Sequence, residues 1–233
     1  MPEQEAKKQN HSVIVNILFN IVIPTLILTK LSADNYLGPQ YSIVIALSFP
    51  LAFGIYDFVK TRRANVFAIL GFISVLLTGG ISLLELDAAY IAIKEASIPG
   101  LIGLATLISV YTPFPLIKTF IFNNEIIDTS KVDSALKRRN SQALFDQTLR
   151  IATYMIAFSF FLSATLNYAL AKILLTSPPG SAEYSAELGK MTGLSFPVIA
   201  LPCTIVMLGA LFYVVKRIEK LTDLSFEEIF RIQ

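Results

Sequence analysis

The chain of 233 residues contains a single cysteine and a single histidine. Without a second cysteine, Cys203 cannot form an intramolecular disulfide or a cysteine-based metal cluster. It lies beside Pro202 in an apolar run, where we interpret it as a small buried side chain. His11 precedes the first apolar run, and one histidine excludes a histidine ligand set. We therefore expect no metal site built on thiolates or imidazoles.

The sequence also lacks the short motifs that identify many enzymes. It has no glycine-rich phosphate loop, no Gly-x-Ser-x-Gly elbow, no His-Glu-x-x-His pair and no Cys-x-x-Cys pair. Carboxylates such as Asp57 and Asp87 are expected at opposite ends of the predicted helices, too far apart to share a metal ion. We predict that the protein is not an enzyme and requires no cofactor.

Charged residues are scarce in this chain. They make up 15% of it, against roughly 25% in a soluble domain, while hydrophobic residues make up 54%. The apolar residues come in runs of about 20, the length that a helix needs to cross a hydrocarbon core about 30 Å thick. The alternating pattern of a membrane β-barrel is absent. The net charge of +2 is too small to suggest a nucleic-acid partner.

These runs predict an all-α, polytopic membrane protein with one membrane domain, a bundle of six transmembrane helices with amphipathic cytoplasmic segments. The spans are predicted at residues 13–31, 41–58, 65–84, 93–111, 151–175 and 191–215. The first run is longer than the roughly 7 to 15 apolar residues of a signal peptide, which favours a retained span. Residues 114–150 are predicted to form a cytoplasmic loop, and residues 216–233 a cytoplasmic tail.

The positions of Lys and Arg predict the orientation. Fifteen of the nineteen lie on the side that carries both termini, which the positive-inside rule places in the cytoplasm. The exceptions are Lys30, Lys94, Lys172 and Lys190. Residues 176–190 begin with a Pro- and Gly-rich stretch and are expected to form a mobile loop on the opposite side.

Four ionisable residues crowd the junction between the third and fourth apolar runs: Glu85, Asp87, Lys94 and Glu95. Charges buried in a bundle are costly and usually functional, so this cluster is a candidate polar entrance for a solute or lipid. The alternative is that all four lie within about one turn of the membrane boundary, where snorkelling removes most of the cost. Asp87 and Lys94 are separated by two helical turns, which predicts that they interact.

Two other polar residues lie in the predicted spans. Asp57 precedes Lys60 and Arg62 by about one turn, so it either pairs with one of these bases or faces the bundle interior as a functional acid. Asn167 is expected near the middle of the fifth span. Both are candidate intramembrane polar sites.

The hydrophilic stretch before the fifth span contains the basic run Lys137, Arg138 and Arg139. This run is a candidate contact for anionic lipid headgroups or a partner protein, although a role in setting topology is enough to explain it. In the tail, Ser225 to Glu228 has the spacing of a capping box. Phe226, Ile229 and Phe230 would share one face of a terminal helix resting on the membrane surface.

Several local patterns resemble the intracellular septation protein A-type family of bacterial inner-membrane proteins. They span roughly residues 50 to 170. The patterns are Tyr56 to Arg63, Gly79 to Leu83 followed by Tyr90, Ile91 and Lys94, Pro115 to Ile117, and Phe160-Phe161 followed by Leu166 and Asn167. The resemblance implies a multi-pass protein of the bacterial inner membrane linked to envelope integrity, elongation or septation, and it supplies no catalytic residues.

Two functions from different classes fit the sequence. The first is a non-enzymatic protein whose cytoplasmic segments, Phe114 to Arg139 and Leu224 to Gln233, dock envelope-synthesis or division proteins in the membrane. The second is a small-solute or lipid transporter that uses the polar cluster. The spans contain few polar groups for coordinating a solute near the bilayer midplane, so we favour docking. Membrane lipids are expected partners, and a homo-oligomer is compatible with the sequence.

Overall fold

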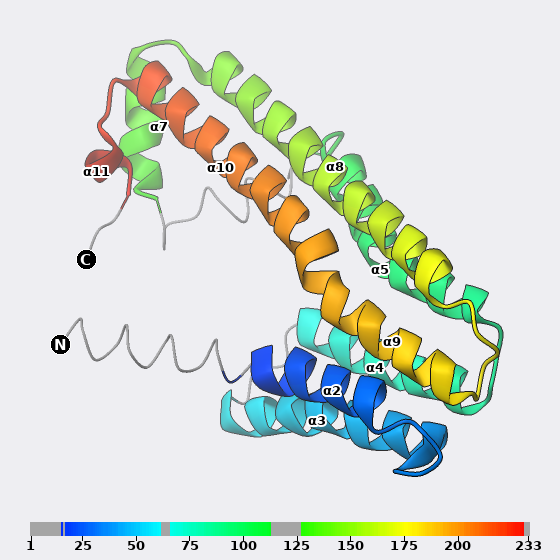
Figure 1. Cartoon of the computed structure of the whole chain (residues 1–233). Coiled ribbons are helices and arrows are strands. Elements are labelled where there is room, and N and C mark those ends of the chain that lie inside the picture. Colours follow the sequence, from blue (N-terminus) through cyan, green and yellow to red (C-terminus); the bar gives the residue numbers. More distant parts are fainter. Residues whose placement is uncertain (1–14, 16, 62–65, 113–126, 231–233) are drawn as a thin grey trace. The chain divides into compact units, whose positions relative to one another are not determined.

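The computed structural model describes residues 15, 17–61, 66–112 and 127–230, and nearly all of them are helical (Figure 1). Among these residues the only extended pairing is an isolated antiparallel bridge between Ile127 and Phe230. The helices group into two compact units: residues 1–98 with 165–199, and residues 99–164 with 200–233. Helices α5 and α8 contribute to both units, and each unit is described by itself.

The first unit combines the N-terminal helices with α9. Its elements are η1 (Leu18–Val22), α2 (Ile23–Lys30), α3 (Gly38–Thr61), α4 (Val66–Leu83), the beginning of α5 (Ala88–Ser109), the end of α8 (Gln142–Leu174), α9 (Ala182–Ser195) and most of η2 (Phe196–Ala200). Prolines accompany both π-helical segments: Pro24 follows η1 by two residues, and η2 contains Pro197. A proline lacks the N–H and adds a ring that interrupts regular α-helical bonding.

Helices α2 and α9 lie side by side in this unit (Figure 1). A Cβ added at Gly189 would lie 2.7 Å from Leu28 Cβ and 2.9 Å from Thr29 Cγ2. One added at Gly193 would lie 3.1 Å from Thr25 Cγ2. The two glycines are four residues apart on one face of α9, the spacing that lets membrane helices approach closely.

The second unit is built on long helices that carry a small helical cluster at one end (Figure 1). Its elements are the end of α5, α7 (Thr129–Arg138), most of α8, α10 (Leu201–Thr222) and α11 (Phe226–Ile229). Helix α8 packs on α10, where the buried Ser159 hydroxyl donates a 3.0 Å hydrogen bond to the Cys203 carbonyl. Gly103 lets α5 approach α8, because a Cβ there would lie 3.1 Å from Phe160 Cβ.

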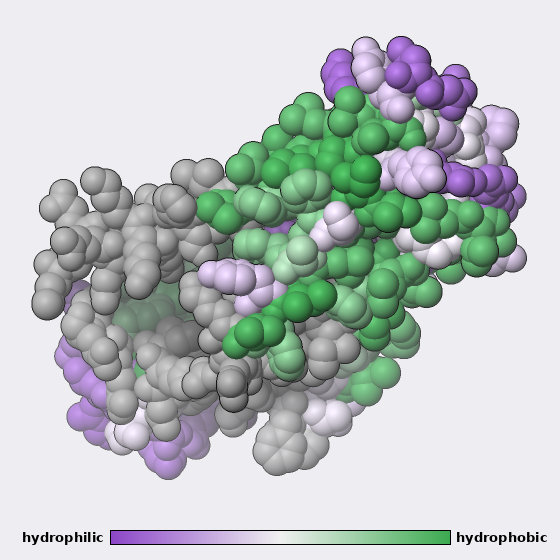
Figure 2. All heavy atoms as spheres, turned by 90° about the horizontal axis from the view of Figure 1, so that it is seen from below, coloured by the Kyte–Doolittle hydropathy of each residue, from purple (hydrophilic) through white to green (hydrophobic). Residues whose placement is uncertain are grey.

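The surface of the described helices is that of a membrane protein. Four helical stretches are long and apolar enough to cross a bilayer: Gly38–Tyr56, Ala88–Ser109, Gln142–Leu174 and Ala182–Thr222. Leu18–Lys30 and Phe72–Leu83 are shorter apolar helices. Figure 2 shows hydrophobic residues over most of the described part of the visible face, with hydrophilic residues gathered in separate patches. The predicted all-α membrane class agrees with this, while four of the six predicted spans match helices of sufficient length.

The predicted loop at residues 176–190 is wrong over most of its length, because α9 begins at Ala182. Ser181 caps this helix: its hydroxyl accepts a 3.0 Å hydrogen bond from the Tyr184 N–H. The connection from α8 therefore shortens to residues 175–181. Helix α9 then continues through η2 into α10, so the helical stretch begins well before the predicted start at residue 191.

The helices extend beyond the predicted membrane spans into the hydrophilic segments. Helix α8 begins at Gln142, so the span predicted at residues 151–175 is the later part of a longer helix, and α10 continues to Thr222, beyond the predicted end of its span at residue 215. Helix α7 lies within the predicted loop 114–150. The start of the predicted cytoplasmic loop, Phe114 to Ile127, is predicted as an amphipathic segment at the membrane surface, and it lies outside the described residues except for Ile127.

Candidate functional site

The structure separates the four residues of the predicted polar cluster into three environments within the first unit. Lys94 and Glu95 lie inside α5, Asp87 caps the start of α5, and Glu85 lies in the turn between α4 and α5. Each environment allows different chemistry.

Lys94 is buried and fully bonded. Its ammonium lies 2.6 Å from Thr78 Oγ1, 3.1 Å from Ser74 Oγ, 3.3 Å from the Ser74 carbonyl oxygen and 2.6 Å from Glu95 Oε1. The side chains of Lys94 and Glu95 are 7% and 25% exposed. An ammonium has three protons to donate, so these four acceptors leave none for a solute.

Lys94 and its partners Glu95, Ser74 and Thr78, which we call the Lys94 group, therefore join α4 to α5. Lys94 lies six residues into α5, or about 9 Å along the helix, which is deeper than the single turn expected from the sequence. The acceptors Ser74 and Thr78 come from α4. A buried charge needs such partners because an unpaired one would carry a large desolvation cost. The arrangement supports a structural link better than an open binding site.

The predicted interaction between Asp87 and Lys94 is wrong. Asp87 precedes α5, so the two-turn helical register does not apply to it. Its Oδ1 instead accepts a 2.7 Å hydrogen bond from the Ala89 N–H, and its carbonyl accepts one from the Tyr90 N–H. Asp87 thus satisfies N–H groups that the first turn of a helix leaves without partners.

Glu85 lies against the connection between α8 and α9. Its backbone is left-handed, with φ of 52°, and Gly180 is also left-handed, with φ of 83°. A Cβ at Gly180 would lie 2.5 Å from the Glu85 Cδ atom. Position 180 therefore favours glycine for its left-handed backbone, while the Glu85 side chain could move to make room for a Cβ.

Glu187 organises the same connection, and sequence reasoning gave it no role. Its carboxylate accepts hydrogen bonds of 2.8 to 3.1 Å from the N–H and hydroxyl groups of both Thr176 and Ser177. These four bonds hold the connection on α9. The only sequence signal was a glutamate soon after a Pro- and Gly-rich turn, which is too common to identify such a contact.

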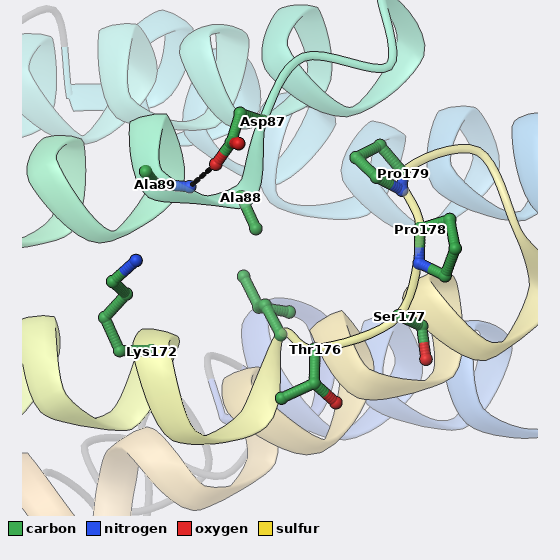
Figure 3. Close-up of a pocket in the computed structure, with 9 residues that line it drawn as sticks. Asp87, Ala88, Ala89, Lys172, Thr176, Ser177, Pro178 and Pro179 are labelled. Atoms are coloured by element: carbon green, nitrogen blue, oxygen red, sulfur yellow. Dashed lines mark hydrogen bonds between the residues drawn. The ribbon is translucent and has the colours of Figure 1, made fainter.

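A cavity of about 310 Å³ lies between this connection and the start of α5 (Figure 3). Its lining comes from the start of α5, the last turn of α8 and the chain that follows α8. The lining residues are Asp87, Ala88, Ala89, Lys172, Leu175, Thr176, Ser177, Pro178 and Pro179. Lys94 and Glu95 do not line it. Its lining combines one acidic and one basic side chain with the hydroxyl residues Thr176 and Ser177 and with five apolar residues.

The other two candidate intramembrane residues are not brought into this cavity lining. Asn167 lies on α8, half-buried, and it has interaction partners. Asp57 lies on α3, with its side chain outside the described part of the structure. Its pairing with Lys60 or Arg62 stays a prediction.

In the second unit, α7, the beginning of α8, the end of α10 and α11 form a cluster that we call the cap (Figure 1). The cap has a hydrophobic core of its own. The buried residues of this core are Ile127, Val132, Leu136, Phe145, Leu149, Ala152, Val214, Ile218, Leu221 and Ile229. The predicted cytoplasmic loop and tail, with its terminal helix, therefore pack together around one core, which the sequence did not predict.

Salt bridges on the cap surface engage two of the three residues in the predicted basic run. Lys137 Nζ lies 2.6 Å from Asp133 Oδ2. Arg139 Nη1 lies 3.3 Å from Asp223 Oδ2. Arg138 is exposed and makes no ion pair with a described residue. The run is thus less free to collect anionic headgroups than three unpaired bases would be.

Helix α11 packs on the cap core, so Ile229, one of the three residues predicted to share a membrane-facing side, is buried in protein, while Phe226 is exposed. Ile229 is fully buried with Ile127, and the Asp128 N–H donates a 2.9 Å bond to the Ile229 carbonyl. The predicted capping box is confirmed, with Ser225 bonded to Glu228. Hydrogen bonds from the Ser225 N–H and from Lys131, whose ammonium lies 2.9 Å from the carboxylate, lower the pKa of Glu228 to about 2.

Among the described residues, no three His, Cys, Asp or Glu side chains lie close enough together to hold a metal ion. No family model, curated protein or solved structure matches the chain. The function of the chain is therefore inferred from the cavity, from Lys94 with its partners, and from the cap.

Proposed function

We propose that the protein is a non-enzymatic, multi-pass protein of the bacterial inner membrane that docks partner proteins through the cap. The proposal includes six transmembrane helices with both termini, and hence the cap, in the cytoplasm. The partners would be other membrane proteins of envelope growth or division.

The observation that carries the proposal is the packing of the cap. Apolar side chains from all four of its helices are buried in one core, while its salt-bridged side chains remain on the surface, as in a small soluble domain. A tail that served only to fix topology would need no such core. The cap gives a membrane-bound chain a stable, solvent-facing surface, which is what a docking protein requires.

The charge of the cap favours a protein partner over an anionic lipid surface. Residues 127–150 and 216–230 contain eight Lys and Arg and seven Asp and Glu, so their formal charges nearly cancel. Attraction to anionic lipid requires an excess of bases, typically four to eight clustered together. Interspersed charges of both signs instead give specificity between proteins, since a wrong partner places like charges together.

The six-span topology rests on helix length as well as on the charge distribution. Helix α4 has 18 residues and is about 27 Å long, close to the thickness of a hydrocarbon core. The described part of the first apolar run, Leu18–Lys30, is shorter. An even number of spans keeps both basic ends of the chain on one side, in accordance with the positive-inside rule.

The Lys94 group supports docking over transport. A transporter needs polar groups near the midplane that can exchange partners with a solute. Lys94 already uses its donors on groups of α4 and on Glu95, and neither Lys94 nor Glu95 lines the cavity. The envelope context is supported by the resemblance of residues 50 to 170 to the septation protein A-type family.

Photo-crosslinking from the cap tests the docking proposal. A crosslinking amino acid at the exposed Ser134 on α7 should capture a discrete membrane partner in growing cells. Reversing Lys137, Arg138 and Arg139 to Glu should abolish the adduct. The matched control is Lys190→Glu, at an exposed base outside the cap, which should leave the adduct unchanged. Equal capture by the triple variant and the control contradicts the proposal.

Cysteine labelling tests the topology. In a Cys203→Ser background, a membrane-impermeant maleimide applied to intact spheroplasts should label Glu183→Cys and leave Ser134→Cys unlabelled until the membrane is opened. Both positions are exposed in the structure. Labelling of position 134 but not position 183 in intact spheroplasts would reverse the assigned orientation.

A further inference from the structure

The cavity at the start of α5 has walls whose own hydrogen-bonding groups are largely used. The N–H and hydroxyl groups of Thr176 and Ser177 bond to Glu187. The Pro178 carbonyl accepts bonds from the N–H and hydroxyl of Ser181. These groups shape the cavity and are not available to hold a ligand.

Two side-chain groups of opposite charge remain available. Asp87 uses Oδ1 to cap α5, and Oδ2 makes no hydrogen bond with a described residue. Lys172, in the last turn of α8, makes neither a hydrogen bond nor an ion pair with one. Figure 3 shows the Lys172 side chain extending from α8 toward the start of α5, where Asp87 lies. The two line one cavity without forming a salt bridge.

From this arrangement we propose that the cavity binds a small zwitterion, in which a primary ammonium is joined by a short link to a phosphate or carboxylate. The ammonium would contact Asp87 and the anionic group would contact Lys172. Leu175, Pro178 and Pro179 would cover the apolar linker. This site is independent of the docking surface proposed for the cap.

Charge and size select this class of ligand. A simple anion would be attracted by Lys172 but repelled by Asp87, and the reverse holds for a simple cation. A zwitterion places a charge of opposite sign against each of the two groups. A volume of about 310 Å³ is at the lower end for small-molecule sites, which suits a compact ligand or headgroup.

The ligand could be a free molecule or the headgroup of a zwitterionic lipid, because both carry an ammonium joined by two carbons to a phosphate, a monoester in O-phosphoethanolamine and a diester in the lipid. The cavity lies at ends of apolar helices: α5 begins there and α8 finishes there. Lipid headgroups are found at such ends in a membrane protein. O-Phosphoethanolamine therefore represents the shared chemistry, and phosphatidylethanolamine represents its lipid source.

Calorimetric titration of the full chain in non-ionic detergent tests the ligand class. O-Phosphoethanolamine should bind at least about tenfold more tightly than inorganic phosphate or ethylamine, since each of these offers only one of the two charges. Phosphate binding as tightly as O-phosphoethanolamine would overturn the zwitterion assignment. So would the absence of zwitterion binding in both this titration and the lipid experiment below.

Variants at the two charged walls test the location. Lys172→Gln and Asp87→Asn should each weaken binding at least about tenfold, and Asn retains the helix-capping ability of Asp. Lys172→Arg keeps the charge and should retain most of the affinity. The controls are Lys190→Gln and Glu183→Gln at exposed positions of α9, outside the cavity. Unchanged affinity in both wall variants would overturn the site.

Native mass spectrometry of the protein released from mixed vesicles of phosphatidylethanolamine and phosphatidylglycerol distinguishes a lipid headgroup from a free molecule as the ligand. Retained phosphatidylethanolamine that is lost in Lys172→Gln identifies the lipid headgroup as the ligand. Binding of O-phosphoethanolamine without selective lipid retention identifies a free zwitterion. Retention of both lipids alike, together with no binding of O-phosphoethanolamine, overturns the proposal.

Discussion

Two ion pairs in this protein have the same length and different surroundings. Lys94 Nζ and Glu95 Oε1 are 2.6 Å apart inside α5 of the first unit, and Lys137 Nζ and Asp133 Oδ2 are 2.6 Å apart on the cap of the second. The side chains of the first pair are 7% and 25% exposed, and those of the second are 62% and 47% exposed. Distance alone therefore does not indicate what either pair contributes.

The surroundings decide how much each pair contributes to stability. Water weakens the attraction between the two charges, and it also solvates either charge when its partner is absent. On the cap, water and salt screen the charges, and either partner can be solvated alone. Around Lys94, removing one partner leaves a poorly solvated charge, which is the costly outcome for a buried pair. The same contact is thus expected to be essential in α5 and dispensable on the cap.

The largest effect is expected from breaking the buried pair. Lys94→Met should lower the free energy of unfolding by about 3 kcal/mol, the lower end for a buried pair, because Glu95 remains partly exposed. Unfolding in mixed micelles, followed by helical circular dichroism, measures this loss. Lys190→Met at an exposed position is the control and should change the free energy by at most about 0.5 kcal/mol.

A double-mutant cycle shows whether the loss comes from the pair. Adding Glu95→Gln to Lys94→Met removes the unpaired carboxylate, so the double variant should lose at least about 1 kcal/mol less than the sum of the two single losses. Additive losses would show that Lys94 acts through Ser74 and Thr78 without energetic coupling to Glu95.

The second largest effect tests how tightly the first unit is packed. Gly189→Ala would place a Cβ 2.7 Å from Leu28 Cβ and 3.2 Å from the Thr25 carbonyl oxygen, so α2 and α9 must move apart. The expected loss of unfolding free energy is about 1 to 3 kcal/mol. Gly54→Ala on α3 is a matched control because, apart from its chain neighbours and its own helix backbone, no described atom lies within 4 Å of the added Cβ. A loss no greater than that of the control would contradict close packing at Gly189.

Some of these features follow from local sequence and others do not. The apolar runs predict the helices because crossing a hydrocarbon core requires long apolar segments. The capping box at Ser225 also follows, since all its bonds lie within four residues. Two further local signals were present and were missed: Asp87 just before an apolar run, typical of an N-cap, and the spacing of Gly189 and Gly193.

The partners of Lys94 and the cap core could not be predicted in this way. Ser74 and Thr78 precede Lys94 by 20 and 16 residues, and the turn at Glu85 decides which face of α4 meets α5. In the cap, Ile127 and Ile229 are brought together by a fold that closes about a hundred residues of chain. Such contacts depend on tertiary packing, which periodicity and local spacing do not specify.

A smaller effect on stability is expected when the pH is lowered, because protonation of Glu228 weakens an exposed interaction on the cap. The pKa of Glu228 falls from 4.5 to about 2 on folding, so its contribution is complete above about pH 4.5 and is lost as the pH falls toward 2. Hydrogen exchange at the Asp128 amide, which bonds to Ile229, should show severalfold weaker protection across this range. Glu228→Gln should remove the dependence, and Glu227→Gln in the same turn should keep it.

The smallest effect is expected at the exposed pair that matches the Lys94 pair in length. Lys137→Ala should change the free energy of unfolding by at most about 0.5 kcal/mol, because Asp133 can be solvated when its partner is removed. Any effect should shrink further in 0.5 M salt, where screening is stronger, whereas the loss in Lys94→Met should change little. A loss at Lys137 comparable to that at Lys94 would mean that the cap excludes solvent from its surface pairs. It would remove the distinction between the two regions and, with it, the argument that the cap surface is free to meet a partner.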